Sequence, residues 1–198
     1  MHYDHRFFEI EATIFQNNIQ DFIFQKPDSL PVLTIRGAFP AFSYAQTAAI
    51  LRGGDFTIEV KPLKNWVWKT KASTLFALNK TQNEWLPLMP SDRVETELRL
   101  DNQSFRRWKQ GFGAVSFSMV KKQNRIPLSI SDFQAPPSGY GLVGLTFGGN
   151  IKMRKQPMEI ILKGDNLFNN PYRDYLDRMR YFSYAVGRNI SLKVKIII

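Results

Sequence analysis

The sequence predicts an all-β fold, an antiparallel meander of about eight long strands. Apolar residues recur at every second position along most of the chain, which is the period of a strand with two different faces. Helical spacing is confined to one short stretch near the C-terminus. Short connections alternate with long ones, as expected for antiparallel neighbours whose two ends have different roles.

The alternation is clearest in the first and last predicted strands. Near the N-terminus, Phe8 and Ile10 alternate with Glu9 and Glu11. Near the C-terminus, aliphatic residues alternate with serine and lysine over residues 190–198. The predicted strands are, in order, 6–24, 41–61, 66–80, 92–101, 109–122, 139–151, 157–168 and 187–198.

The connections between these strands differ in length. The last long one contains Asn170-Pro171, an N-cap followed by proline, which predicts a short surface helix. Transmembrane β-barrels have short periplasmic turns and longer outside loops, so uneven connections are typical of that class. Short links at 62–65 and 152–156 alternate with long ones at 25–40, 81–91, 123–138 and 169–186, and the turn at 101–109 is intermediate.

The composition makes several kinds of site unexpected. The 198 residues include no cysteine and only two histidines, His2 and His5, so thiolate metal sites and histidine-based triads are not expected. The carboxylate pairs Glu9/Glu11 and Glu95/Glu97 are expected to hydrate a lumen or to pair with lysine or arginine. We therefore expect no catalytic residue, no metal site, no cofactor and no enzymatic activity.

The chain is strongly basic, with 27 Lys and Arg against 17 Asp and Glu and a net charge of +10. This excess suits nucleic acid, an anionic lipid surface or an anionic ligand. The basic residues are dispersed, because the only adjacent pairs are Arg106-Arg107, Lys121-Lys122 and Arg154-Lys155. We therefore do not expect nucleic acid as a partner.

The period of two does not by itself distinguish a soluble β-sandwich from a membrane barrel, because both have one apolar face. Several predicted strands exceed the mode of about 5–6 residues in globular proteins and suit the roughly 9–11 that cross a bilayer. Aromatic residues such as Trp66, Trp68 and Tyr140 lie near strand ends, as in interfacial girdles. A transmembrane barrel is favoured. A small autonomous eight-stranded pore or adhesin, and a soluble barrel that binds an apolar ligand, remain alternatives.

Three stretches carry a family resemblance. Asn166-Leu167-Phe168-Asn169, then Tyr172-Arg173-Asp174-Tyr175-Leu176, then Gly187-Arg188-Asn189 before the terminal strand, resemble the C-terminus of TonB-dependent outer-membrane receptors. Tyr44-Ala45-Gln46-Thr47 with Gly53-Gly54-Asp55 looks like that family's strand with a Gly-x-acidic element. Leu86-Pro87-Leu88-Met89-Pro90 followed by Arg93 looks like its proline-rich loop before a strand.

The resemblance implies that the chain belongs to a larger barrel. Receptors of this family have about 22 strands around a lumen that holds an N-terminal plug. Residues 1–198 are therefore expected to be the C-terminal β-barrel segment, with plug domain and signal peptide absent, since no basic stretch followed by an apolar run opens the chain. The family usually ends in an aromatic residue, whereas this chain ends in Ile198.

The resemblance also implies a function, the uptake of a large scarce nutrient across the bacterial outer membrane. The nutrient is usually a ferric siderophore and sometimes haem, cobalamin or a glycan. The implied partners are the TonB complex, reached through the missing N-terminal part, the nutrient itself, and outer-membrane lipid and lipopolysaccharide.

Basic and aromatic residues on the predicted long loops are candidates for binding an anionic ferric complex, through charge and ring contact. Contact between the basic loops and lipopolysaccharide phosphates is the alternative. The candidates are Lys26, Arg36, Phe39, Phe42, Trp85, Arg178, Arg180 and Tyr181.

The residues of the C-terminal motif are expected to be structural. Asn166 and Asn169 are expected to close a turn through side-chain hydrogen bonds, and Gly187 to permit an unusual φ or a close approach. Arg188 is expected to pair with a carboxylate such as Glu159. The motif comprises Asn166, Leu167, Phe168, Asn169, Tyr172, Gly187, Arg188 and Asn189.

Overall fold

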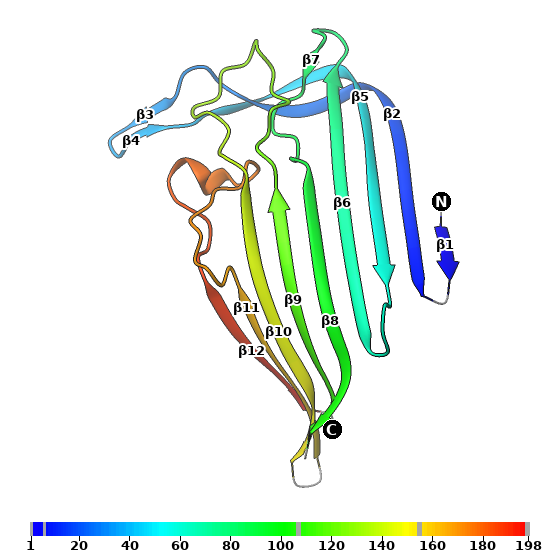
Figure 1. The fold of residues 1–198 in the computed structure, drawn as a ribbon. Helices are drawn as coiled ribbons and strands as arrows, with labels where there is room; N and C mark the ends of the chain where they lie inside the picture. Colours follow the sequence, from blue (N-terminus) through cyan, green and yellow to red (C-terminus); the bar gives the residue numbers. More distant parts are fainter. Residues whose placement is uncertain (1, 6, 106–107, 154–155, 197–198) are drawn as a thin grey trace.

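A computed structural model describes residues 2–5, 7–105, 108–153 and 156–196. All eight predicted strands are present and lie in one antiparallel sheet, in the order β1-β2-β5-β6-β8-β9-β10-β11-β12 (Figure 1). The predicted strands are β2 (Phe8–Pro27), β5 (Phe42–Val60), β6 (Trp66–Asn79), β8 (Arg93–Phe105), β9 (Trp108–Val120), β10 (Tyr140–Met153), β11 (Gln156–Asp165) and β12 (Asn189–Ile196).

Further short strands were not predicted. β1 (His2–His5) pairs with β2, and β7 (Glu84–Trp85) pairs with the end of β6. The predicted loop 25–40 contains a small hairpin of β3 (Val32–Thr34) and β4 (Gly37–Phe39). β8 and β9 extend into the predicted turn 101–109. Residues 106–107 and 154–155, within two predicted links, and Ile198 lie outside the described residues.

The short helix predicted after Asn170-Pro171 is present as one 3₁₀ turn, but its predicted start is wrong. Residues 171–174 have no helical structure, and the 3₁₀ turn η1 (Arg178–Tyr181) begins later, with Asp177 as its N-cap. The Tyr172 carbonyl accepts a hydrogen bond from the Ala185 N–H at 2.9 Å, so the loop uses a backbone group that a helix would need. No helix among the described residues is long and apolar enough to cross a membrane.

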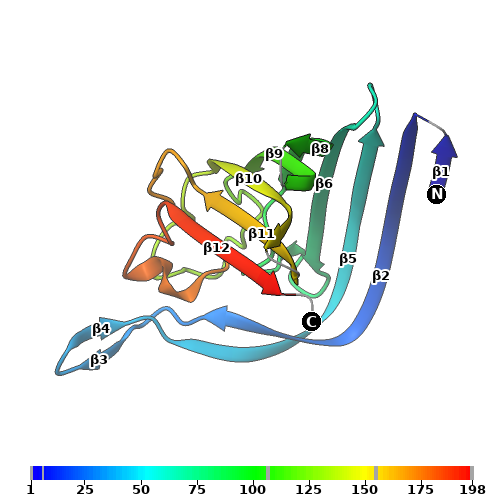
Figure 2. The same cartoon turned by 90° about the horizontal axis from the view of Figure 1, so that it is seen from below.

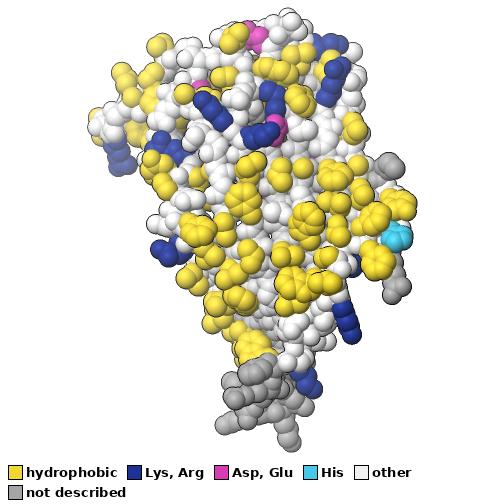
Figure 3. Space-filling view, in the orientation of Figure 1, with side chains coloured by type: hydrophobic (Ala, Val, Ile, Leu, Met, Phe, Trp, Pro, Cys, Tyr) yellow, Lys and Arg dark blue, Asp and Glu magenta, His cyan; other side chains and the backbone are white. Residues whose placement is uncertain are grey.

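The strand register separates the sheet into two faces. One row of paired residues across the sheet consists of Val60, Trp68, Leu98, Val115 and Leu145. The apolar face consists of this row and of the rows two residues away along each strand, on the same side of the sheet. Figure 3 shows hydrophobic side chains over the strands on this face, which Figures 1 and 2 show to be convex.

The opposite, polar face lies on the concave side. Glu59, Lys69, Glu97 and Ser116 form a row across it, and Lys69 Nζ lies 3.1 Å from Glu59 Oε2. Glu95 lies opposite Lys71 in the next row. Lysines therefore lie opposite Glu95 and Glu97 in the register, and ion pairing of these two carboxylates stays a prediction.

A β-bulge in β2 changes which face its residues occupy. Ile19 pairs with Ala49 and Phe22 with Thr47, so β2 has one more residue than β5 between these pairs. Because side chains alternate between faces, the extra residue turns Phe22 and Phe24 toward the concave side. There Phe24 packs with Ala49, Ala77 and Leu86, a buried core cluster under the loops.

The sheet is an open arc (Figure 2). Within the described residues, β1 and β12 are its two ends, and each pairs with one neighbour. Beyond the bulge, β2 and β5 bend across the concave side and carry the β3–β4 hairpin toward the loop that holds η1 (Figures 1 and 2).

Candidate functional site

The four long connections meet at one end of the sheet (Figure 1). They join through contacts between residues far apart in the sequence. The Leu88 N–H donates to the Tyr175 hydroxyl at 3.3 Å, and Gln134 Nε2 donates to the Tyr181 carbonyl at 3.1 Å. Ser129 donates through its hydroxyl to Glu84 Oε2 at 2.5 Å. We call residues 28–41, 80–92, 121–139 and 166–188 the loop layer.

Arg180 is the buried centre of the loop layer. It is 2% exposed, forms an ion pair with Asp132, and donates to the Tyr181 hydroxyl at 2.7 Å. The Tyr181 hydroxyl in turn donates to Asp132 Oδ1 at 2.8 Å. Burial, together with this bond to Asp132, raises the pKa of the Tyr181 phenol above its ordinary value. Arg180 therefore holds the connections 123–138 and 169–186 together.

Four of the predicted ligand-binding residues come together beside this centre. The Phe42 ring centroid lies 6.1 Å from that of Tyr181, and Phe39 lies 5.7 Å from Phe182. The Arg178 guanidinium carbon lies 4.1 Å from the Phe42 ring centroid, and Arg178 donates to Gln25 Oε1. We call Phe39, Phe42, Arg178, Tyr181 and Phe182 the hairpin cluster, because it joins the β2–β5 hairpin to η1.

The other candidates lie elsewhere. Arg36 is exposed in the β3–β4 turn, where its N–H donates to Thr34 Oγ1 at 3.1 Å. Lys26 lies in β2 opposite Ser43, so its predicted position on a loop is wrong. Trp85 lies in β7 with its ring 6.3 Å from Phe76, a residue of the apolar face. Ligand binding by these residues stays a prediction.

The C-terminal motif closes the last turn of the sheet. Asn166 and Asn169 have positive φ angles of 49° and 53°, which asparagine tolerates better than most residues. Asn166 Oδ1 accepts the Asn170 N–H at 2.9 Å, and Asn169 Oδ1 accepts the Arg188 N–H at 2.9 Å. A Cβ at Gly187 would lie 2.6 Å from Asn169 Oδ1. The local bond of Asn166 and the close approach at Gly187 agree with the prediction, whereas the Asn169 bond joins residues 19 positions apart and is not of the Asx type. Together these contacts position β12 against β11.

The remaining motif residues anchor the same loop. The Leu167 N–H donates to the Val143 carbonyl at 3.0 Å, and the Tyr172 ring lies 4.4 Å from Tyr140. Phe168 is 72% exposed, and Asn189 begins β12 opposite Asp165.

The predicted pairing of Arg188 with Glu159 is wrong. Glu159 lies opposite Lys195 in the β11–β12 pair, whereas Arg188 precedes β12 at the loop end. The six residues that separate Glu159 from Asp165 place it about 20 Å away along the strand, at about 3.3 Å per residue.

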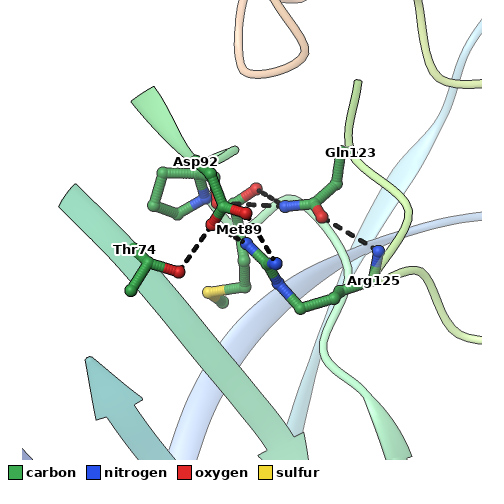
Figure 4. Close-up of polar contacts among 6 residues, drawn as sticks. Thr74, Met89, Asp92, Gln123 and Arg125 are labelled. Atoms are coloured by element: carbon green, nitrogen blue, oxygen red, sulfur yellow. Dashed lines mark hydrogen bonds and ion pairs between the residues drawn. The ribbon is translucent and has the colours of Figure 1, made fainter. Parts of the chain in front are cut away.

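Residues that the sequence interpretation did not single out supply much of the loop layer. Figure 4 shows Asp92 between Thr74 and Arg125, and Gln123 beside the Met89 carbonyl. Gln123 Nε2 also donates to the Pro90 carbonyl at 3.0 Å. Thr74 lies in β6, whereas Asp92, Gln123 and Arg125 lie in the loop layer. Their partners are 18 to 34 positions away in the sequence. The only sequence feature noted near these residues was the proline-rich stretch Leu86–Pro90, which provides the Met89 and Pro90 carbonyls that accept from Gln123. Among the described residues, no group of three or more His, Asp or Glu side chains could hold a metal ion.

No protein-family model and no curated protein matches the chain. Solved structures do match, among them the copper transporter OprC, with a TM-score of 0.74 and 17% sequence identity. The match covers 98% of this chain and 29% of that transporter chain, so the chain spans less than a third of its length. This likeness confirms the predicted fold class, an antiparallel meander of long strands that forms part of a transmembrane β-barrel.

Proposed function

We propose that residues 1–198 are the C-terminal β-barrel segment of a TonB-dependent receptor in the bacterial outer membrane. The observation that carries this proposal is the open, curved sheet. Its structural match to the copper transporter covers 98% of this chain and 29% of the transporter chain. An open sheet edge in lipid leaves backbone N–H and C=O groups without partners, at a cost of several kcal/mol each. The edges of β1 and β12 therefore need further strands of the same barrel.

The apolar face supports the membrane setting. Its side chains are large and exposed, for example Trp68 at 46%, Leu98 at 44%, Val115 at 50% and Phe147 at 50%. Soluble monomers rarely expose a continuous apolar surface of this extent. This disfavours a soluble barrel, and the open arc disfavours an autonomous eight-stranded barrel.

The receptor takes up a ferric siderophore or a similarly large nutrient, with energy from the TonB complex acting through a part of the receptor outside this segment. Arg178 and Phe39 and Phe42 of the hairpin cluster support an anionic, partly aromatic nutrient, and Arg36 in the exposed β3–β4 turn adds a second cation. The basic loops also contact outer-membrane lipid and lipopolysaccharide. Uptake involves no covalent chemistry, so the receptor is not an enzyme.

Uptake in cells tests the transport proposal. Cells with and without the gene, and cells that have the gene but lack TonB, are given labelled ferric catecholate, ferric hydroxamate or Cu²⁺. Uptake of a ferric complex that requires both the gene and TonB supports the proposal. Uptake of Cu²⁺ alone that requires the gene and TonB would support a TonB-dependent transporter but contradict the proposed ferric nutrient. Uptake that does not depend on the gene would refute both the transport function and the nutrient.

Charge reversal tests the nutrient site. We expect Arg36→Glu with Arg178→Glu in the full-length receptor to weaken binding of an anionic ferric complex by about 10-fold or more, at roughly 1 kcal/mol for each charge removed and more for reversal. Both side chains are exposed, and the contacts of Arg178 with Gln25 and Phe42 lie at the loop ends of β2 and β5, so we expect the rest of the sheet to be unaffected. Unchanged affinity would show that Arg36 and Arg178 do not contribute to nutrient binding.

A further inference from the structure

The apolar face contains one groove that ends in charged residues. The groove has a volume of about 460 Å³ and crosses β2, β5, β6 and β8. Ala12, Gly54 and Ala72 form its floor, since these small residues alternate with bulkier neighbours such as Phe56 and Val94. All of these positions belong to the apolar face, so the groove opens on the convex side of the sheet.

The end of the groove nearer the loops is polar. Asp92 accepts a hydrogen bond from Thr74 Oγ1 at 2.6 Å and forms a two-point ion pair with Arg125, at 2.5 and 3.1 Å (Figure 4). Lys121 also lines the groove, and its side chain is exposed. Within the described part of the chain, no ion pair includes Lys121, although its positive charge contributes to lowering the pKa of Asp92. Asp92, Arg125 and Lys121 together carry a net charge of +1, so this end attracts an anion.

The charged end lies at the border of the apolar band. The aromatic residues Phe76 and Trp85 lie just beyond it, and the Arg125 guanidinium lies 4.6 Å from the Phe76 ring centroid. Trp68 and Phe76 lie eight residues apart on β6, which corresponds to about 26 Å along the strand. With a tilt of about 40°, the vertical distance is about 20 Å, close to the roughly 25 Å height of the apolar band in outer-membrane barrels.

We propose that the groove binds one membrane lipid that carries a phosphate, with an acyl chain along Ala12, Gly54 and Ala72 and the phosphate at Lys121. The occupant must be apolar over the floor and anionic at one end, and it must reach the site from the bilayer. A phosphate-bearing lipid satisfies all three conditions, whereas free phosphate uses only the charged end. The proposal rests on the membrane setting proposed above.

Lipid binding to the full-length protein in detergent micelles tests this proposal. Native mass spectrometry measures affinity for dioleoyl phosphatidylglycerol and for dioleoyl phosphatidylcholine, with inorganic phosphate as a competitor. We expect phosphatidylglycerol to bind about fivefold more tightly than phosphatidylcholine, as one lysine near a membrane surface implies. Lys121→Ala removes that preference, and Ala72→Leu weakens both lipids by narrowing the floor.

Lys122→Ala is the matched control, because it removes the same charge from an exposed neighbour that does not line the groove. It retains the preference for phosphatidylglycerol. Lys121→Ala changes an exposed side chain, so its result does not depend on refolding. Equal binding by the two lysine variants would overturn the proposal, and so would full displacement of phosphatidylglycerol by inorganic phosphate.

Flotation with lipid vesicles separates the two proposals. If the protein floats with vesicles but does not prefer phosphatidylglycerol to phosphatidylcholine through Lys121, the membrane setting is supported and the lipid site is refuted. A protein that does not associate with vesicles at all refutes the membrane setting on which the site rests.

Discussion

The strands and the loop layer are held together in different ways. In the strands, each residue has a partner set by register, and the rows from Val60 to Leu145 and from Glu59 to Ser116 repeat one alternation across the sheet. In the loop layer, single polar side chains such as Arg180 and Asn169 join segments far apart in sequence. The strands are therefore expected to tolerate single substitutions, while the loop layer depends on a few residues.

The bulge in β2 connects the two regions, and its removal should have the largest effect. Inserting one alanine between Thr47 and Ala48 gives β2 and β5 equal residue numbers between the flanking pairs, so Phe22 and Phe24 turn to the apolar face and leave the core cluster. The expected loss is about 3–5 kcal/mol in the free energy of unfolding, as for removal of a buried phenylalanine. Urea unfolding in micelles, followed by tryptophan fluorescence, measures it.

Asp21→Ala is the control for this insertion. It removes the hydrogen bond from Gln46 Nε2 to Asp21 Oδ1 at 2.8 Å but keeps the extra residue. Its expected cost is about 1 kcal/mol. An insertion no more costly than the substitution would show that the bulge does not direct Phe22 and Phe24.

Loss of Arg180 should open the loop layer and leave the strands in place. Arg180→Ala leaves Asp132 and Tyr181 without their buried partner, at an expected cost of about 3 kcal/mol. Hydrogen exchange should then increase in residues 123–138 and 169–186 and stay unchanged in β6 and β8. Arg178→Ala, in the same turn but exposed, is the control. Equal exchange in the two variants would remove Arg180 from its central role.

Gly187 tests how the loop positions the last strand. Gly187→Val places a Cβ against Asn169 Oδ1, so either the bond to the Arg188 N–H or the start of β12 must shift. The expected cost is about 1–3 kcal/mol, typical of overpacking. Thermal unfolding in micelles measures it against Gly113→Ala, whose Cβ meets only the Phe147 side chain. Equal melting temperatures would contradict the close approach.

The smallest expected effect is a pH dependence of one loop contact. The hydrogen bond from the Ser129 hydroxyl lowers the pKa of Glu84 below its ordinary value of 4.5. A lowered pKa in the folded state means that the contact contributes stability above pH 4.5 and loses it as the pH falls through the lowered pKa. Exchange of the Ser129 amide should therefore accelerate in acid, and Glu84→Gln should abolish that dependence. If acid changes the exchange rate of the Ser129 amide equally in the wild type and in Glu84→Gln, the predicted pH dependence of this contact is refuted.

The sequence predicted the strands well because their evidence is local. Alternation of Phe8 and Ile10 with Glu9 and Glu11 is visible without knowing any partner, and all eight strands appear near their predicted bounds. The turn formed by Asn166, Asn169 and Gly187 was also predictable, because few residue types other than asparagine and glycine fit such positions.

The loop layer was predicted less well, because its contacts join distant residues. Nothing near Arg180 in sequence indicates that Asp132 neutralises it, so a residue expected on a binding surface lies buried in an ion pair. Lys26 was expected on a loop because hydrophobic alternation stops near Phe24, whereas the bulge allows β2 to continue to Pro27. The gathering of Phe39, Phe42 and Tyr181 depends on the bend of β2 and β5, which alternation does not show.

Lipid accessibility along β9 tests the membrane setting most directly. Nitroxide labels are placed one at a time at Val115, Ser116, Phe117 and Ser118 in the bilayer-reconstituted protein, and collisions with oxygen and with a water-soluble nickel complex are compared. Val115 and Phe117 belong to the apolar face, and Ser116 and Ser118 to the polar face. We expect oxygen to dominate at Val115 and Phe117 and the nickel complex at Ser116 and Ser118. Equal accessibility at all four positions, or the reverse alternation, would contradict a barrel segment whose convex face contacts lipid.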